Sequence, residues 1–521
     1  MHYLAHYENM NTAALKRLFT PQTPFGPHMA NMKDSELFDE FYYESDAFTQ
    51  ALSWNMRLIL GRRGCGKSSV IGRILTGSEF DEKIVFKQAK CMHFLTKFCS
   101  SNSITLNDLP VEQIYNLWRN LYWLILISHF WGKTERTADI LFAEPTEARK
   151  RVFQHFSFKR GESATTDLLA NDYLAMREYF SSESFVRDVK AACQALGSKT
   201  AVICLDNDEQ TKINNEVARS LLAGLLHSLT EFSEETSNVV IKCFFPSEIS
   251  SILEEVCDNW GKLAPCKMIM RWEQNELLIV LCKRLQLYLH LCGKEKDFDV
   301  DTVRKAKSVW AKHFSSTVWN DHFRTEEDSK TYVFRHSQLL PRQVVTICNL
   351  IAQGSSADIG REVFTNEDIR KGVRLAQPEI CKEIFSTYTH VYPQSFELSR
   401  QYLGEINIRV SYGELDALQN KIDLLRYPRY RQNMQYFVRM LLSLGLIGVG
   451  KHPEEYKALK YYDVDFEYFF PSEINFNSQT IFYVHPAFIE YLAVKASLIN
   501  CGRPIRPHGV EIEEPPPEGP P

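Results

Sequence analysis

The chain has 521 residues, of which 44% are hydrophobic and 24% charged, and its formal net charge is −5. This length is enough for about three domains, and the composition is typical of a soluble globular protein. The negative net charge argues against tight, non-specific nucleic-acid binding by the whole chain. Residues 121–131, the most apolar stretch, are too few to span a bilayer. Without CxxC pairs or a signal-peptide pattern, we expect a cytoplasmic protein with no membrane association.

Residues 1–50 are predicted to form an N-terminal arm that packs on the domain that follows it. Across residues 51–290, short apolar runs alternate with longer segments of helical periodicity. The predicted strands are 56–60, 83–87, 200–205, 239–245 and 267–271, and helices are predicted at 110–132 and 212–232. This alternation is typical of an α/β fold whose parallel sheet is covered by helices on both faces.

A complete phosphate-binding loop of the form G-x-x-x-x-G-K-S follows the first predicted strand. Its residues are Gly61, Arg62, Arg63, Gly64, Cys65, Gly66, Lys67 and Ser68, and Ser69 continues into a segment with helical spacing. A strand, a glycine-rich turn and a helix form the context in which this motif binds nucleotide. Glycines let backbone N–H groups point at phosphates, and the helix start adds the positive end of its dipole.

The residue types in the loop predict which residues bind phosphate and which bind the metal ion. Lys67 is expected to reach the β- and γ-phosphates, and the Ser68 hydroxyl to bind Mg²⁺. Residues 420–423 match N-K-x-D, the guanine-reading motif of GTPases, but lie far downstream in a stretch with helical spacing. We interpret that match as chance, so ATP with Mg²⁺ is the expected ligand. The alternative is a loop that keeps its fold and binds nothing.

An acidic sequence follows the strand predicted at 200–205. Asp206 comes at its end, followed by Asn207, Asp208 and Glu209. A hydrophobic strand that ends in acids downstream of a phosphate loop is the Walker B arrangement. We therefore expect Asp206 to bind Mg²⁺, directly or through water, and Glu209 to activate the attacking water. Asp208 is the second candidate for that base, and an acidic surface turn is the non-functional alternative.

Further polar residues are candidates for sensing the γ-phosphate. Ser247 and Glu248 follow the strand predicted at 239–245. One of them is a candidate to sense the γ-phosphate, and the alternative is that they only cap the end of the strand. Arg342, at the start of a predicted helix, and Arg284, on an earlier one, are cations that would offset charge developing during hydrolysis. Arg342 is the favoured arginine, and a solvated surface residue is the alternative for both.

The remainder of the chain predicts a helical lid at 291–355 and a winged-helix-like domain at 356–500. The elements expected in the latter are helices at 411–426 and 430–445 and strands at 457–470 and 479–485. Thr365 has the position and type of a helix N-cap, because carboxylates follow it in the first turn. Residues 501–521 are rich in proline and glycine, and we expect them to be a disordered tail.

The chain resembles the STAND-related branch of the AAA+ P-loop ATPases, in particular a family of bacterial ATPases often linked to phage defence. The segments that carry this resemblance are 54–69, 205–209, 244–248, 272, 276–278 and 340–342. One position departs from the AAA+ pattern, because Asn207 follows Asp206 where glutamate is usual. The identity of the catalytic base is therefore open between Asp208 and Glu209.

The resemblance implies an ATP-hydrolysing regulatory switch that forms homo-oligomers or controls a separately encoded effector. The alternative is a DNA-binding loader or remodelling ATPase of the AAA+ type. For that function, Arg426, Arg429 and Arg431, interleaved with tyrosines, are candidates for phosphate contacts, although a solvated basic turn is favoured. Acids at 463, 465 and 467 oppose such a contact in the wing. A small-molecule kinase would need an acceptor pocket that we cannot identify.

Overall fold

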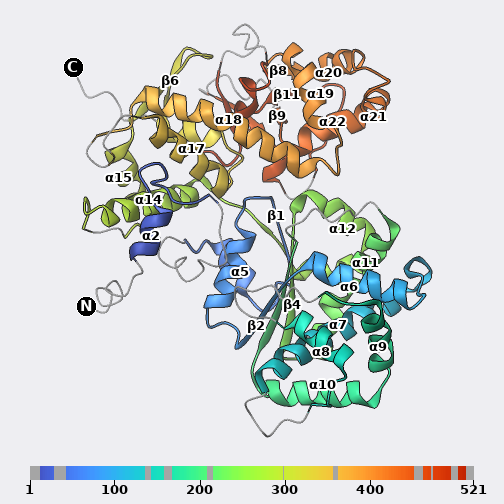
Figure 1. The fold of residues 1–521 in the computed structure, drawn as a ribbon. Coiled ribbons are helices and arrows are strands. Elements are labelled where there is room, and N and C mark those ends of the chain that lie inside the picture. Colours follow the sequence, from blue (N-terminus) through green and yellow to red (C-terminus); the bar gives the residue numbers. More distant parts are fainter. Residues whose placement is uncertain are drawn as a thin grey trace.

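The computed structural model describes residues 12–28, 43–134, 142–157, 167–207, 215–296, 299–355, 359, 362–450, 461–470, 473–494 and 503–511. Figure 1 shows a lower lobe built around one parallel sheet and an upper lobe of helices with a second sheet. We define the lower lobe as residues 43–273 and the upper lobe as residues 12–28 and 274–511. Within these described ranges, no helix is both long enough and apolar enough to cross a membrane.

The lower lobe is built on five parallel strands in the order β2-β3-β4-β1-β5. The strands are β1 (Leu58–Gly61), β2 (Glu82–Lys87), β3 (Ala201–Asp206), β4 (Val239–Phe245) and β5 (Lys267–Met270). β1, β3 and β4 are buried along their whole length, which is why each is a continuous apolar run in the sequence. The predicted α/β fold with a parallel P-loop core is confirmed.

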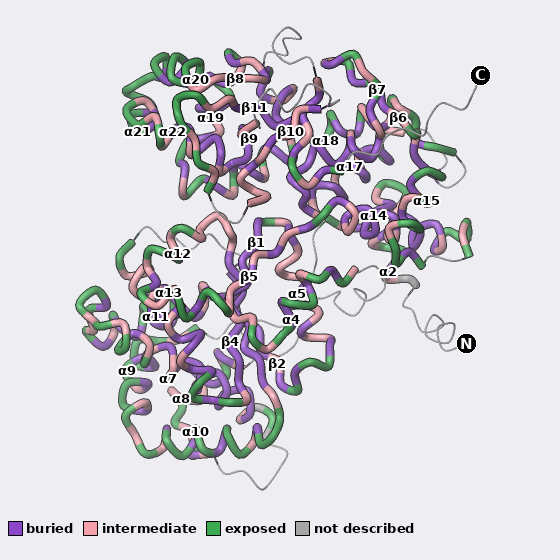
Figure 2. The backbone as a smooth tube through the Cα atoms, turned by 180° about the vertical axis from the view of Figure 1, so that it is seen from behind, coloured by how far each residue is buried: buried purple, intermediate pink, exposed green. Residues whose placement is uncertain are grey.

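Helices cover both faces of this sheet. α4 (Asp46–Leu52) and α5 (Lys67–Thr76) share a hydrophobic core with Ile59, whereas α6 (Gln88–Ser101), α7 (Val111–Thr134) and α11 (Glu216–Glu235) share another with Leu58. Successive side chains of β1 therefore serve opposite cores, as strand geometry requires, and the strands are buried between the layers (Figure 2). The other helical segments are η2 (Leu106–Asp108), α8 (Glu147–Phe156), α9 (Ala170–Phe180), α10 (Glu183–Leu196), η3 (Ser247–Ile249), α12 (Ser250–Val256), α13 (Trp260–Leu263) and η4 (Ala264–Cys266).

The upper lobe begins with α14 (Gln274–Leu291), which the sequence assigns to the P-loop core ending at residue 290. In the structure α14 packs against α15 (Val303–His313), α17 (Pro341–Gly354) and α2 (Thr12–Leu18). α14 is buried around most of its circumference, and a helix of that kind needs other helices on several sides. The N-terminal arm is divided between the two lobes, because α4 packs on the sheet of the lower lobe and α2 packs on α14 of the upper lobe.

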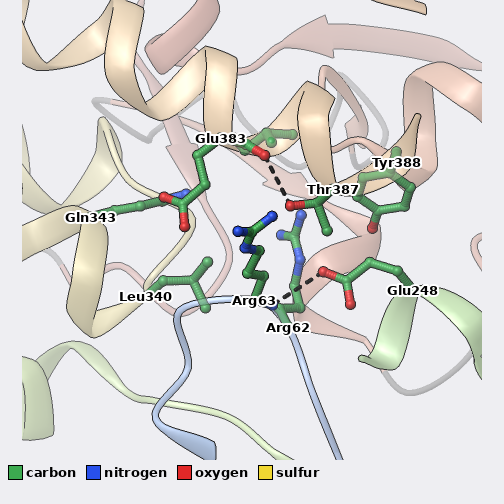
Figure 3. A pocket seen from close by; sticks show the side chains of 9 residues that line it. Arg62, Arg63, Glu248, Leu340, Gln343, Glu383, Thr387 and Tyr388 are labelled. Atoms are coloured by element: carbon green, nitrogen blue, oxygen red, sulfur yellow. Dashed lines mark hydrogen bonds between the residues drawn. The ribbon is translucent and has the colours of Figure 1, made fainter. Parts of the chain in front are cut away.

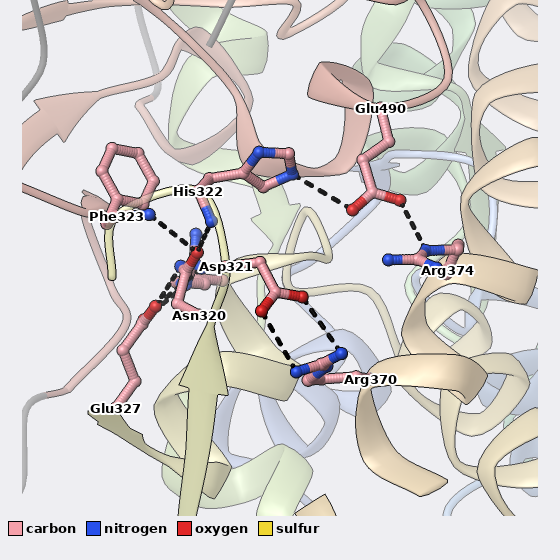
Figure 4. Close-up of polar contacts among 9 residues, drawn as sticks. Asn320, Asp321, His322, Phe323, Glu327, Arg370, Arg374 and Glu490 are labelled. Atoms are coloured by element: carbon pink, nitrogen blue, oxygen red, sulfur yellow. Dashed lines mark hydrogen bonds and ion pairs between the residues drawn. The ribbon is translucent and has the colours of Figure 1, made fainter. Parts of the chain in front are cut away.

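A β-hairpin interrupts the predicted helical lid. Its strands are β6 (Thr317–Asn320) and β7 (Thr325–Asp328), and α16 (Ser329–Arg335) follows. Figure 4 shows how the turn of the hairpin docks on the C-terminal part: Asp321 pairs with Arg370 at 3.0 Å, and His322 Nε2 lies 3.1 Å from the Glu490 carboxylate. These partners are distant in the sequence, so local helical periodicity did not disclose the hairpin.

The C-terminal part carries a second sheet in the order β12-β10-β9-β11-β8. Its strands are β8 (Arg409–Ser411), β9 (Ile447–Gly450), β10 (Tyr462–Asp465), β11 (Ile481–Val484) and β12 (Ile505–Pro507). Its helical segments are α18 (Asn366–Tyr388), α19 (Ser395–Tyr402), η5 (Leu403–Glu405), α20 (Tyr412–Gln419), α21 (Pro428–Gln432), α22 (Met434–Ser443), η7 (Glu467–Phe469) and α23 (Pro486–Ile489). Thr365 caps α18 through a capping box, as predicted. The helix predicted at 411–426 is shorter in the structure: α20 ends at Gln419, and a turn follows in which the Asp423 carboxylate accepts a hydrogen bond from the Leu425 N–H.

Part of the predicted disordered tail is ordered. Strand β12 pairs in parallel with β10, and Ile505 and Val510 are buried in the upper-lobe core. The Glu511 N–H then donates to the Gln274 side chain at 2.8 Å, at the start of α14. Two apolar residues and a backbone pairing partner thus order residues 503–511, although the surrounding composition is that of a flexible tail.

Candidate nucleotide-binding site

The phosphate loop lies between β1 and α5 at the carboxyl edge of the sheet. Gly66 has φ 105°, a left-handed conformation that favours glycine. A Cβ at Gly61 would collide with the Cys65 sulfur, so glycine is also needed where β1 ends. The chain therefore turns tightly enough for α5 to begin at Lys67, and the expected strand, loop and helix are present.

Two side chains fix the shape of the loop. The Lys67 ammonium donates to the carbonyl oxygens of Gly61 at 2.5 Å and Arg62 at 3.2 Å, and the Trp272 indole N–H donates to the Cys65 carbonyl at 2.7 Å. Cys65 is buried, and burial raises the pKa of its thiol, which disfavours the reactive thiolate. Ser68 and Ser69 follow in the first turn of α5, both half-buried.

Asp206 lies at the same edge of the sheet as the loop. β3 is separated from β1 only by β4, a distance of about 10 Å between strands. The Asp206 side chain is 1% exposed and pairs with the Lys87 ammonium at 2.8 Å. Its second oxygen, Oδ1, is buried and has no hydrogen-bond partner among the described residues. A buried, unsatisfied carboxylate oxygen fits the oxygen ligands that Mg²⁺ prefers.

Asn207 continues this edge, and its N–H donates to the Phe244 carbonyl at 3.1 Å. Asp208 and Glu209, the two candidates for the catalytic base, lie outside the described residues. The assignment of Glu209 therefore stays a prediction from the sequence.

Ser247 and Glu248 come directly after β4, in η3. The Glu248 carboxylate accepts a hydrogen bond from the Arg63 N–H at 3.2 Å, so this acid touches the phosphate loop itself. The Ser247 hydroxyl makes no hydrogen bond to the part of the chain that the structure describes. Of the two residues predicted after this strand, Glu248 is the one with a contact to the loop.

The two candidate arginines differ in position. Arg342 lies against the loop, because a Cβ on Gly64 would be 3.1 Å from the Arg342 Cβ. Its guanidinium forms an ion pair with Glu383 of α18, and its Nε is buried without a partner among the described residues. Arg284 instead donates to the carbonyls of Phe25 at 3.1 Å and Pro27 at 2.9 Å. The structure therefore brings Arg342, and not Arg284, to the phosphate loop.

The upper lobe contacts the loop through Arg62. This arginine is only 8% exposed, its guanidinium lies 5.3 Å from the centre of the Tyr468 ring, and its Nε and Nη1 are buried without partners in the described part of the chain. Figure 3 shows the small pocket between the loop and α17 and α18. It is lined by Arg62, Arg63, Glu248, Leu340, Gln343, Glu383, Ile384, Thr387 and Tyr388.

Sequence reasoning missed three contributors to this site. Lys87 ends β2, and the parallel arrangement brings it to Asp206, so its place at a strand end was a usable signal. Trp272 was noted only for family resemblance, and its hydrogen bond to the loop depends on β5 lying beside β1. Tyr468 is 406 residues from Arg62 in the chain, and no local pattern indicates that contact.

No protein-family model and no curated protein matches the chain. Among solved structures, it is similar to the ORC2 protein of Aeropyrum pernix in ADPNP–ADP complexes, with 14% identity and a TM-score of 0.33 over 88% of this chain and 91% of that one. The ADP form of the same protein matches with 14% identity and a TM-score of 0.28 over 91% and 97% of the two chains. These scores are too low to support an argument about function, which rests on the chain's own geometry.

Proposed function

We propose that this protein is an ATP-dependent regulatory switch that binds ATP·Mg²⁺ at the phosphate loop and hydrolyses it. The observation that carries the proposal is the intact loop between β1 and α5, with Asp206 buried at the same sheet edge and one of its oxygens unsatisfied. Positioning of phosphates and stabilisation of charge account for most of the catalysis of phosphoryl transfer. Both require a fixed loop and a carboxylate for the metal ion.

Each residue has a proposed role in this reaction. The loop N–H groups and Lys67 bind the phosphates, and Ser68 and Asp206 hold Mg²⁺, which would neutralise charge on the phosphate oxygens. Glu209, or else Asp208, takes the proton of the attacking water. Arg342 is the cation that contacts the nucleotide, because it already lies against Gly64.

The contacts of the upper lobe support a switch rather than a simple hydrolase. α17, α18 and the segment carrying Tyr468 all border the loop, so nucleotide phosphates and the upper lobe share the same groups. We assign the unit of β8, α20, α21, α22, β9 and β11 as winged-helix-like, since its helices lie between β8 and β9 in the chain and β11 pairs antiparallel with both of these strands. Changes in the contacts of α17, α18 and Tyr468 with the loop would then control assembly of copies of the chain or an effector. Phage defence is the pathway that family resemblance favours.

Steady-state ATP hydrolysis tests the enzymatic part of this function. Turnover within about 1–10³ per second is expected for the wild type, with loss in Glu209→Gln and in Lys67→Ala. Lys97→Ala is the matched control, because Lys97 is exposed on α6, away from the sheet edge. Equal stabilisation of the wild type and Lys67→Ala against heat by ATP would remove the site assignment.

The switch itself needs a second readout. Glu209→Gln with ATP is expected to change its mass in solution or its protease pattern relative to the ADP-bound protein. If both stayed the same, the protein would be an ATPase without a nucleotide-dependent state.

A DNA-binding function is the second candidate, and one observation favours it. The guanidinium of Arg429 lies 4.0 Å from the Tyr436 ring centre and that of Arg426 lies 5.2 Å from the Tyr427 ring centre. Neither these arginines nor Arg431 forms an ion pair with a carboxylate in the described ranges. Three such cations, two of them beside aromatic rings, suit phosphate and base contacts.

The adjoining helix argues against reading of bases. Half of the residues of α22 are buried, and its Arg439 pairs with Glu467 at 3.1 Å. Binding to a DNA duplex that falls steeply with salt and weakens in Arg429→Ala/Arg431→Ala would support this function. Binding unchanged by the double substitution would eliminate the site.

A further inference from the structure

The position of Lys67 identifies the end of the loop that faces the terminal phosphate. A P-loop lysine reaches the β- and γ-phosphates, and the Lys67 ammonium lies on the carbonyls of Gly61 and Arg62. The next residue along the chain is Arg63, whose N–H donates to Glu248. Glu248 therefore contacts the loop at the end where a third phosphate is expected.

The chemistry of Glu248 limits what it can do there. An ionised carboxylate only accepts hydrogen bonds and has no proton to donate. A residue that favours a γ-phosphate must donate a hydrogen bond or carry positive charge, as Lys67 and Arg342 do. Near a phosphate of like charge, the Glu248 carboxylate opposes binding, since like charges brought together cost free energy.

Unsatisfied polar atoms surround this contact. Glu248 and Arg62 both line the pocket above the loop (Figure 3). Arg62 is more than nine-tenths buried, with Nε and Nη1 unpaired among the described residues, and Glu248 Oε2 is also buried and unpaired there. Buried donors without acceptors cost free energy, and an anion that entered this pocket would supply acceptors for Arg62.

We infer that Glu248 sets the preference of the site between nucleoside triphosphate and diphosphate. This inference rests on the proposed function. The Glu248 carboxylate and a γ-phosphate compete for the Arg63 N–H, so a triphosphate binds only with displacement of Glu248. A diphosphate lacks the third phosphate and leaves the Arg63–Glu248 contact in place. Glu248 thereby keeps the site in its diphosphate-compatible form until the triphosphate displaces the carboxylate.

The test compares affinities for two nucleotides in wild type and Glu248→Gln. Glutamine keeps the size and the accepting oxygen of the side chain but carries no charge. With Mg²⁺ present, we measure the dissociation constants of ADP and of a non-hydrolysable ATP analogue by calorimetry. Glu248→Gln is expected to bind the triphosphate analogue about tenfold more tightly and ADP with nearly wild-type affinity.

Glu255→Gln is the matched control, because Glu255 lies on α12 close in the sequence but pairs with Arg219 at 2.6 Å. It is expected to leave both constants unchanged. Glu248→Ala is the second variant, expected to raise the ratio of triphosphate to diphosphate affinity in the same direction. Thermal unfolding without nucleotide identifies a variant that has not folded, and the ratio is then taken from the other variant.

Two failures are distinguishable. If the wild type binds neither nucleotide, or Lys67→Ala binds both as well as the wild type does, the proposed function is wrong. If Lys67→Ala loses binding but the affinity ratio is unchanged or falls in Glu248→Gln and Glu248→Ala, the inference about Glu248 is wrong and the function stands.

Discussion

Two buried carboxylates at opposite edges of the same sheet have different surroundings. At the amino edge, Glu82 at the start of β2 accepts from His129 Nε2 at 2.9 Å, forms an ion pair with Lys133 and lies 3.8 Å from the Lys199 ammonium. At the carboxyl edge, Asp206 has the Lys87 ion pair, and its Oδ1 is unsatisfied among the described residues.

The comparison separates a carboxylate that stabilises the fold from one available to a ligand. A buried charge surrounded by partners contributes to the folded state, whereas a buried acceptor without a partner costs free energy. Such a cost persists most readily where a ligand relieves it during function. We therefore expect changes at Glu82 to alter stability and changes at Asp206 to alter nucleotide chemistry.

The largest effect is expected from Asp206→Asn. Loss of a metal-binding carboxylate removes several kcal/mol of charge stabilisation, which corresponds to about 10³-fold in turnover. Steady-state hydrolysis at saturating ATP and Mg²⁺ measures it. If Asp206→Asn retained wild-type turnover, Asp206 would not be the metal ligand.

Glu82→Ala is expected to act on stability instead. It leaves the buried His129 without its partner and removes the attraction to Lys133, so the free energy of unfolding should fall by about 2–3 kcal/mol. Urea denaturation measures the fall, and Glu79→Gln, at a partly exposed site, is the control. Wild-type stability together with weaker ATP binding would reverse the assignment of the two edges.

The same glutamate predicts a dependence of stability on pH. The hydrogen bond from His129, followed by the contacts with Lys133, lowers the pKa of Glu82 from 4.5 to about 2. A carboxylate whose pKa is lower in the folded state stabilises the protein at pH values above its unfolded-state pKa. This stabilisation is lost as the pH falls through the folded-state pKa.

The stability difference between wild type and Glu82→Gln should therefore be constant above pH 4.5 and shrink between 4.5 and about 2. Denaturation at several pH values measures this difference. A difference that grew with acidification would contradict the assigned direction.

The smallest expected effect comes from Lys87→Gln. The Lys87 ammonium and Mg²⁺ compete for the Asp206 carboxylate, so removing the charge should strengthen Mg²⁺ binding in the presence of ADP about threefold. Titration of Mg²⁺ by calorimetry measures it, with Lys97→Gln as the control. Weaker Mg²⁺ binding in Lys87→Gln would indicate that Lys87 orients Asp206 rather than competing for it.

The local sequence was enough to predict the phosphate loop and the sheet that carries it. Strands β1, β3 and β4 are continuous apolar runs because both of their faces are buried. The tight turn after β1 requires glycine at position 61, and the negative charge of phosphate requires a cation such as Lys67. Asp206 could be predicted because the carboxyl ends of parallel strands lie at the same edge of a sheet. A residue that ends β3 must therefore lie at the edge where the loop follows β1.

Only the tertiary structure decided which other groups meet the loop. Tyr468 on Arg62 and Glu248 on the Arg63 N–H are contacts between residues far apart in the chain. The order of residues 503–511 likewise depends on β10, which offers a partner strand. Periodicity and motifs report on neighbours within one element, whereas these contacts depend on how separate elements pack, so the sequence determined the phosphate loop and the fold determined what covers it.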